Sequence, residues 1–217
     1  MLQYKTTLLF DLDGTLTDPA AGIMKSVKYA LSHYDITIED LDSLKVFIGP
    51  PLQDSFVKYF GLSKKDADDA IWKYREYYGD KGIYECTLYP SIEKLLEGLS
   101  AQGKMLLLAT SKPTVYAVKV LENFGILGRF AFVGGSELDG TRTQKDEVIA
   151  HVLSSMGITP GDRLLMLGDR SYDILGAHKN GMQALGLCYG YGSREELVQA
   201  GADYIADTVA QACALLL

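Results

Sequence analysis

The sequence predicts an α/β fold, with a parallel sheet at its core and an inserted all-helical domain. After residue 100, short apolar runs alternate with segments of helical periodicity. This alternation is typical of parallel strands that have helices on both faces. The insert is predicted because no convincing strand lies between Asp18 and Gly82. A chain of 217 residues is long enough for such a core with a smaller domain inside it.

The core is expected to be Rossmann-like and to comprise residues 1–17 and 84–217. Its strands are expected in mostly apolar runs, at residues 6–10, 104–109, 130–133, 163–167, 183–187 and 204–206. Its helices are expected where apolar residues recur at helical spacing, at residues 91–100, 113–124, 145–156 and 193 to about 200. Ser193 with Glu196 forms a capping-box pattern at the start of the last helix.

The helical insert is expected to span residues 18–83. Asp18 suits a helix N-cap and Pro19 the first helical position, and apolar residues follow at helical spacing. Ser63 predicts the start of a second helix of the insert. Residues 48–52 contain two prolines and are expected to form a rigid loop.

Composition argues against several classes of protein. The net charge of −7, with no basic block, argues against a nucleic acid polymer as partner. No apolar run approaches the roughly 20 residues of a membrane span, and the first residues lack a secretory signal pattern, so we expect a cytoplasmic protein without a membrane partner. Cys86, Cys188 and Cys213 are widely spaced and are expected to be reduced thiols. The sequence leaves open whether the protein is a monomer or a homodimer.

Two carboxylates follow directly on the first predicted strand. Asp11 and Asp13 are two residues apart, and Gly14 then allows a sharp turn. Side chains at i and i+2 of an extended segment point the same way, and ligands of open α/β sheets bind outside the carboxyl ends of the strands. Two converging carboxylates repel one another, which suggests a divalent cation beside them.

Three further signals fall at strand ends or helix starts. Thr110 and Ser111 follow the second predicted strand, where a hydroxyl and free amides at a helix N-terminus suit an anion. Lys145 begins a predicted helix, a locally unfavourable place for a cation unless something anionic lies opposite. Asp169 and Asp173 follow the fourth predicted strand and add two more carboxylates.

Together these residues resemble the motifs of the haloacid dehalogenase superfamily of hydrolases, and within it the phosphoglycolate phosphatase and 5'-nucleotidase branch. Asp11-Leu12-Asp13-Gly14-Thr15 is similar to the first motif of that superfamily. Thr110 resembles the second motif and Lys145 the third, while Gly168-Asp169 through Asp173 resembles the fourth. The insert resembles the cap domain of the family. In many relatives Pro follows the third-motif Lys, whereas here Asp146 does, so Arg142 is a conceivable substitute for Lys145.

The resemblance implies a Mg²⁺-dependent phosphatase that acts on a small phosphorylated metabolite, such as phosphoglycolate or a nucleoside 5'-monophosphate. Asp11 would attack phosphorus and form an aspartyl-phosphate, and Asp13 would act as general acid and then general base. Phosphate would be bound by Thr110, Ser111 and Lys145. The metal would be held by Asp11, the Asp13 carbonyl and Asp169, with Asp173 orienting metal-bound water or Lys145.

Other interpretations of the same residues stay open. A sugar-phosphate phosphotransferase, or mutase, would use the same carboxylates with a cap that excludes water, and a phosphate-binding regulator would have lost turnover. A dehalogenase is disfavoured because such enzymes need no acid at the position of Asp13. Individually, Thr110 could be a helix cap, Lys145 a surface residue and Asp173 an ordinary first-turn acid. No partner is apparent for the three histidines, His33, His151 and His178, and they are given no role.

Overall fold

The computed structural model describes residues 2–217 and divides into two compact units. The α/β unit comprises Met1–Asp18 and Leu88–Leu217, and the helical unit comprises Pro19–Thr87. The sequence had placed the joins after residues 17 and 83. Among residues 2–217, no helix is both long enough and apolar enough to cross a membrane.

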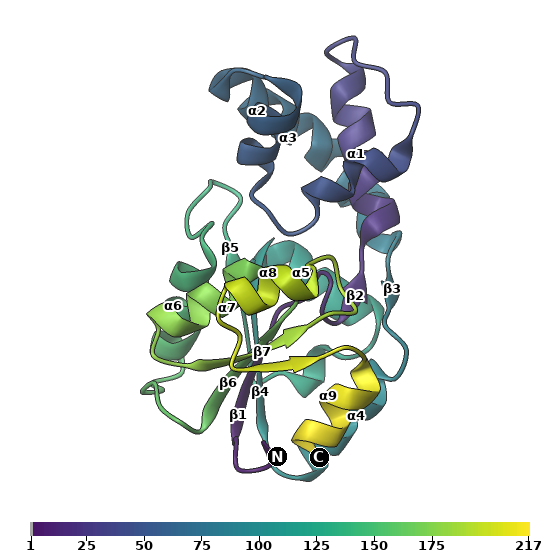
Figure 1. Cartoon of the computed structure of the whole chain (residues 1–217). Helices are drawn as coiled ribbons and strands as arrows, with labels where there is room; N and C mark the ends of the chain where they lie inside the picture. Colours follow the sequence, from purple (N-terminus) through teal and green to yellow (C-terminus); the bar gives the residue numbers. More distant parts are fainter. Residues whose placement is uncertain (1) are drawn as a thin grey trace. The chain divides into compact units, whose positions relative to one another are not determined.

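The α/β unit contains a six-stranded sheet in the order β5-β4-β1-β6-β7-β8 (Figure 1). All its neighbouring strands are parallel, as expected. The strands are β1 (Thr7–Phe10), β4 (Met105–Pro113), β5 (Phe132–Ser136), β6 (Leu164–Gly168), β7 (Gln183–Leu187) and β8 (Tyr204–Ala206). Two short strands, β2 (Thr17–Asp18) and β3 (Thr87–Leu88), form a separate two-stranded sheet.

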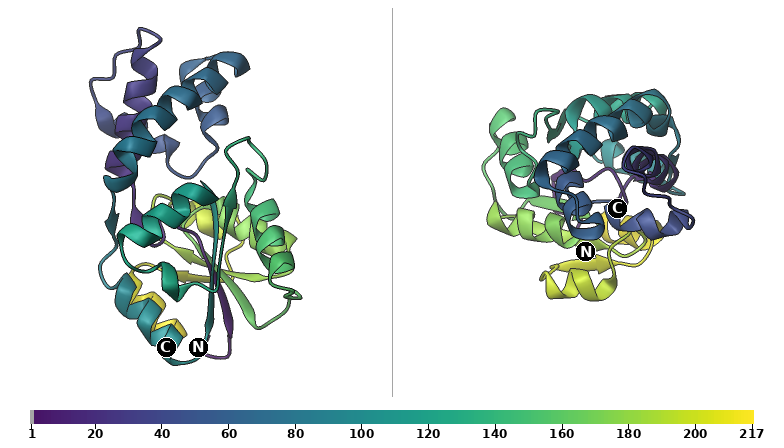
Figure 2. Two further views of the ribbon diagram at one scale, coloured as in Figure 1. Left: turned by 180° about the vertical axis from the view of Figure 1, so that it is seen from behind. Right: turned by 90° about the horizontal axis from the view of Figure 1, so that it is seen from above.

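Helices cover both faces of the six-stranded sheet (Figure 2). One face contacts α6 (Lys145–Ser155) and α7 (Ser171–Lys179), against which α8 (Arg194–Gln199) packs. On the other face, α4 (Ile92–Ala101) and α5 (Thr114–Asn123) contact the sheet, and α9 (Val209–Leu216) packs on α4. A short 3₁₀ helix, η3 (Leu127–Arg129), follows α5.

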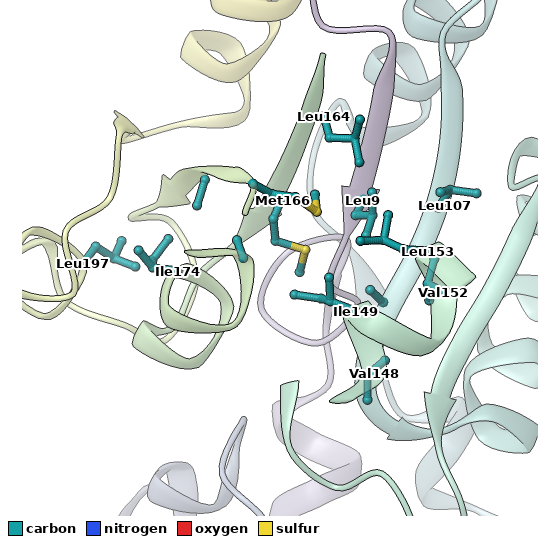
Figure 3. Close-up of a cluster of buried hydrophobic side chains, with 14 residues drawn as sticks. Leu9, Leu107, Val148, Ile149, Val152, Leu153, Leu164, Met166, Ile174 and Leu197 are labelled. Carbon is teal, nitrogen blue, oxygen red and sulfur yellow. The ribbon is translucent and has the colours of Figure 1, made fainter. Parts of the chain in front are cut away.

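The buried apolar cluster on the α6 and α7 side explains why these runs form strands (Figure 3). Leu9, Leu107 and Met166 come from three adjacent strands and pack in one cluster with Val148 and Ile174 of the helices. Because side chains alternate between the faces of a sheet, the residues between them supply the opposite face. Uncharged apolar runs therefore fold as strands buried on both sides.

The helical unit has its own core. Its elements are α1 (Ala20–Ser32), η1 (Leu41–Phe47), α2 (Leu52–Phe60), α3 (Lys64–Asp80) and η2 (Gly82–Tyr84). Phe47 and Phe56 are buried and meet edge to face at 5.0 Å. Tyr74 and Tyr78 are also buried and stack at 5.2 Å. The side chain of Ser63 accepts from the Asp66 amide, which confirms the expected cap of α3.

The structure corrects several expected boundaries. Asp18 is not the cap of α1, because it lies in β2 and its carboxylate accepts a hydrogen bond from the Tyr191 hydroxyl. Pro19 takes the N-cap position instead. Pro113 likewise precedes α5, and β4 continues through Thr110 to Pro113 with a register shift. The helices α2, α7 and α9 had no explicit counterpart in the expectation from sequence, and Leu52, expected in a loop, begins α2.

Candidate active site

The candidate site lies at the carboxyl edge of the sheet. Asp11 follows the last residue of β1, and Asp169 follows the last residue of β6. Thr110 lies in the last part of β4, which is the neighbour of β1 on the side away from β6. Because the strands are parallel, their carboxyl ends share one edge. The strand order alone therefore brings residues that are far apart in the chain to one place.

Lys145 forms the centre of a buried ion-pair network. Its Nζ lies 2.8 Å from Asp11 Oδ1 and 2.9 Å from Asp173 Oδ1, and it also donates to the Ala109 carbonyl at 3.1 Å. All three charged side chains are at least nine-tenths buried. Burial alone would lower the pKa of Lys145, but the two carboxylates outweigh it and raise that pKa above the usual range. The ammonium group therefore stays charged.

The helix start explains how Lys145 reaches this network. Gln144 caps α6 in a capping box with Glu147, so the chain turns into the helix at Lys145 itself. The unfavourable position of a cation at a helix N-terminus is offset here by carboxylates from two other elements. The sequence predicted an anionic group opposite Lys145. The carboxylates of Asp11 and Asp173 supply that negative charge.

Asp13 has a partner that sequence analysis missed. Lys112 Nζ lies 2.7 Å from Asp13 Oδ1, and the side chains are 6% and 13% exposed. Burial raises the pKa of Asp13, and the charge of Lys112 opposes that rise without cancelling it. The only signal for Lys112 was its place directly after Thr110 and Ser111 at a strand end.

Asp169 is held by neutral donors. Its Oδ2 accepts from the Tyr191 amide at 2.8 Å, and its Oδ1 from the Thr15 hydroxyl at 3.4 Å. Gly14, with φ of 84°, lets the chain turn close to this carboxylate, because a Cβ there would lie 2.2 Å from Asp169 Oδ2. Burial, followed by the charges of Asp173 and Asp11, raises the pKa of Asp169 well above its usual value.

Asp173 is buried and tied at both oxygens. Its Oδ2 accepts from the Arg170 amide at 3.0 Å, and its Oδ1 faces Lys145. Burial raises the pKa of Asp173 to about 6, although Lys145 acts in the opposite direction. The first-turn acid of α7 thus has two roles, since it caps its own helix and holds the lysine.

Thr110 and Ser111 lie at the same edge but not at a helix N-terminus as expected. Both belong to the irregular end of β4, before α5 begins at Thr114. The buried Thr110 hydroxyl accepts from the Lys112 amide at 3.3 Å, and the Ser111 carbonyl accepts from the Ser136 hydroxyl at 2.7 Å. The pairing of β4 with β5 is irregular between Ala109 and Pro113. This irregular strand end, and not a helix N-terminus, places the polar groups of Thr110 and Ser111 at the edge of the sheet.

The donor set fits a hard divalent cation. Asp11, Asp169 and Asp173 each offer a carboxylate oxygen, and these oxygens lie within 4.8 Å of one another. Within this group Lys145 supplies one positive charge against three carboxylates, while Asp13 is balanced by Lys112. Among residues 2–217, the group contains carboxylates and no His or Cys, and buried carboxylates with unbalanced negative charge suit Mg²⁺. The grouping differs from the sequence expectation in that it includes the carboxylate of Asp173, which was expected only to orient metal-bound water or Lys145.

Two residues discussed from sequence have their contacts elsewhere. Arg142 donates from Nε to the Gly135 carbonyl at 3.4 Å and pairs through Nη2 with Glu137. Lys145, and not Arg142, therefore forms the ion pair with Asp11. The expectation that the histidines have no partner was wrong for two of them, because His178 Nε2 lies 3.0 Å from Asp203 Oδ2 and His33 Nδ1 lies 3.0 Å from the Tyr29 carbonyl oxygen.

Comparison with known proteins relates this geometry to one family. The model of the family described as haloacid dehalogenase-like hydrolase matches residues 8–187. A 5'-nucleotidase of Pseudomonas aeruginosa is 46% identical over 190 residues, which cover 88% of this chain and 86% of that protein. A phosphoglycolate phosphatase of Pasteurella multocida is 29% identical over the full length of both chains. The crystal structure of a predicted phosphatase from Clostridium acetobutylicum superposes with a TM-score of 0.93 at 47% identity, covering 96% of each chain.

Proposed function

The chain belongs to the haloacid dehalogenase-like hydrolase family and is a phosphatase, and from this premise we propose that it hydrolyses a small phosphorylated metabolite through an aspartyl-phosphate on Asp11. The observation that carries the proposal is the buried network in which Lys145 bridges Asp11 and Asp173. Burying these charges is costly, and an arrangement of this kind at the carboxyl edge of a parallel sheet is typical of a reactive site.

In the first step, a carboxylate oxygen of Asp11 attacks phosphorus and the ester bond to the leaving oxygen breaks. Lys145 holds Asp11 through Oδ1 at 2.8 Å, which orients the carboxylate. Asp13 donates a proton to the leaving oxygen, a role favoured by burial because it raises the pKa of Asp13 toward the protonated form. The product is an alcohol and a phosphorylated Asp11.

In the second step, Asp13 takes a proton from water and the water oxygen attacks the phosphorus of the aspartyl-phosphate. The bond from phosphorus to Asp11 breaks, so inorganic phosphate leaves and the carboxylate is restored. Thr110, Ser111 and Lys145 would bind the phosphoryl oxygens in both steps. Asp173 acts through Lys145, which it holds at 2.9 Å.

Mg²⁺ is the cation we propose for this site. Asp11, Asp169 and the Asp13 carbonyl would hold it, and the carboxylate of Asp173 lies within the same group. When bound, the cation would neutralise the negative charge of the phosphoryl group and of the carboxylates. Burial, followed by the charges of Asp173 and Asp11, raises the pKa of Asp169, and a cation beside these carboxylates would offset their mutual repulsion.

The names of the relatives indicate the substrate class. Phosphoglycolate and nucleoside 5'-monophosphates are the esters that we propose to test first, because the relatives are named phosphoglycolate phosphatase and 5'-nucleotidase. Both kinds of ester are small and have an alcohol leaving group, which requires the general acid Asp13.

The test is phosphate release from a panel of such esters with Mg²⁺, by the wild type and by Asp11→Asn. The amide is far less nucleophilic, so release should fall at least on the order of a thousandfold. Asp69→Asn, at an exposed position of α3, is the matched control and should retain wild-type turnover. Substantial release by folded Asp11→Asn would contradict the role of Asp11.

A further inference from the structure

The loop after β7 contacts two functionally different parts of the α/β unit. From this loop, at residues 188–193, Tyr191 donates its amide to Asp169 Oδ2 at 2.8 Å. The Tyr191 hydroxyl donates to the carboxylate of Asp18. One residue therefore connects a carboxylate of the candidate metal group with Asp18.

Asp18 marks the point where the chain leaves the α/β unit. It ends β2, and the helical unit begins at Pro19. The chain returns at Leu88, and the next residue, Tyr89, lies close enough to Tyr191 for their phenol groups to interact. The Tyr89 amide also donates to the Leu16 carbonyl at 3.0 Å. Tyr191 thus contacts residues at both connections to the helical unit.

The main chain of this loop packs closely against Asp169 and Gly14 at the carboxyl edge of the sheet. A Cβ on Gly190 would lie 2.4 Å from both Asp169 Oδ2 and the Gly14 carbonyl oxygen. The neighbouring Tyr189 donates its hydroxyl to the Thr15 carbonyl at 2.9 Å, and its ring meets that of Tyr89 edge to face at 5.0 Å. A loop packed this closely has little freedom to move independently of Asp169 and Gly14.

We propose that Tyr191 is a positioning residue, which fixes Asp169 with its amide and the exit strand β2 with its hydroxyl, so that the catalytic edge and the connections to the helical unit are mechanically coupled. The coupling requires the phenol hydroxyl and an oxygen acceptor at Asp18. It does not depend on which ester is hydrolysed or on whether a metal is bound. It goes beyond the proposed reaction, because none of the catalytic steps uses Tyr191 or Asp18.

The experiment is amide hydrogen exchange by NMR on the whole metal-free protein. The reporters are the amides of Thr17, which donates to Leu12, of Tyr89, which donates to Leu16, and of residue 191, which donates to Asp169. In Asp18→Ala and Tyr191→Phe all three should exchange about tenfold faster, as expected for the loss of one hydrogen bond to a charged group. The amides of β7 should be unchanged, which separates this effect from global destabilisation.

Two further variants make the test specific. Asp18→Asn keeps an oxygen acceptor and should restore exchange to within threefold of wild type. Tyr189→Phe removes one hydroxyl of the same loop that does not bond Asp18, and it should leave the three reporters within threefold of wild type. The double variant of Asp18→Ala and Tyr191→Phe should be no faster than either single variant.

The result that would overturn the inference is equally specific. If Asp18→Ala speeds exchange at Thr17 and Tyr89 but not at the amide of residue 191, the exit strand and Asp169 are not coupled. Additive effects in the double variant, or no rescue by Asp18→Asn, would overturn it as well. Since no readout uses turnover, failure here is distinguishable from failure of the proposed phosphatase reaction.

Discussion

The α/β unit and the helical unit differ in where their charged side chains lie. Among the residues of the α/β unit that the structure describes, six charged residues are buried: Lys5, Asp11, Lys104, Lys145, Asp169 and Asp173. Of residues 19–87, all of which the structure describes, no charged side chain is buried. Ion pairs of the helical unit, such as Lys25 with Glu85 and Lys73 with Glu76, are exposed.

The difference supports the proposed location of the reaction in the α/β unit. Exposed ion pairs contribute little to stability, whereas a buried charge is costly unless it is paired. Lys5 and Lys104 donate to neutral oxygen acceptors, mostly main-chain carbonyls. The other four buried charges gather at the carboxyl edge of the sheet. Packing of uncharged side chains accounts for the buried residues of the helical unit. It does not account for the buried charges at the carboxyl edge of the sheet.

The largest expected effect is the removal of Lys145. Lys145→Ala leaves Asp11 and Asp173 buried without their cation, so it should lower the free energy of unfolding by about 3–5 kcal/mol at pH 7 and abolish turnover. Chemical denaturation and phosphate release measure both effects. The matched control is Lys73→Ala, which removes an exposed pair of α3 and should change neither. Equal effects of the two substitutions would contradict the comparison.

The same variant has a predicted pH dependence. The folded-state pKa of Asp173, about 6 with Lys145 in place, already lies above the ordinary value of an aspartate. Without Lys145 it should rise further, so the folded variant binds more protons than the unfolded chain and gains stability as the pH falls. The stability loss should therefore shrink between pH 7 and pH 5. A loss that grows over this range would contradict the assignment of the buried carboxylates.

The second prediction concerns Asp169 and the metal. Asp169→Asn removes a carboxylate whose pKa is raised by burial and by Asp173 and Asp11, so the metal-free variant should be no less stable than the wild type. Mg²⁺ at a hundred times its Kd should stabilise the wild type by about 2.7 kcal/mol and the variant far less. Turnover should fall at least about a hundredfold.

Metal removal gives an independent check on the same site. EDTA should stop phosphate release and Mg²⁺ should restore it. Ca²⁺ should inhibit, because it prefers more ligands at longer distances and would favour bidentate binding of Asp11. Full turnover in chelator would show that the carboxylate group needs no cation.

The third prediction separates the acid from the nucleophile. Asp13→Asn should reduce the phosphorylation step by about 100-fold or more for alkyl phosphates, whose leaving oxygen needs a proton. The loss should be much smaller for p-nitrophenyl phosphate, which has a good leaving group. Rapid-quench kinetics measures that step directly. Equal losses for both esters would show that Asp13 is not the general acid.

The smallest expected effect lies in the helical unit. We propose that it acts as a cap that discriminates among leaving groups. Replacing Pro50 and Pro51 with Gly should change the relative kcat/KM of phosphoglycolate and nucleoside monophosphates by about tenfold, or about 1.4 kcal/mol. p-Nitrophenyl phosphate should be little affected. An unchanged substrate ranking in folded variants would leave residues 19–87 with a structural role alone.

Much of the α/β unit could be predicted from sequence, because its signals are local. Mostly apolar runs predicted the strands, the carboxylates that follow two of these runs identified Asp11 and Asp169 as candidates, and a cation at the start of a predicted helix identified Lys145. Boundaries were less accurate. β4 runs on through Thr110 to Pro113 because it stays paired with β5 across a register shift, and no local pattern marks such a shift.

The contacts that were missed are long-range. Lys112 reaches Asp13 across 99 residues of sequence, and Tyr191 reaches Asp18 across 173. Sequence periodicity predicts helices and strands. It does not predict which side chains contact one another when the loops that follow different strands come together. The N-cap expected at Asp18 failed for the same reason, since a hydroxyl from a distant loop bonds its carboxylate.

The central claim is that Asp11 becomes phosphorylated, and its most direct test is to observe that intermediate. Wild type and Asp13→Asn are mixed with substrate and Mg²⁺, quenched in acid, digested and analysed by mass spectrometry. The peptide that contains Asp11 should gain the mass of one phosphoryl group, more so in Asp13→Asn with p-nitrophenyl phosphate, because its second step lacks a general base. Asp11→Asn should show no such peptide. A phosphoryl group on another residue, or turnover without any phosphorylated peptide, would contradict the account.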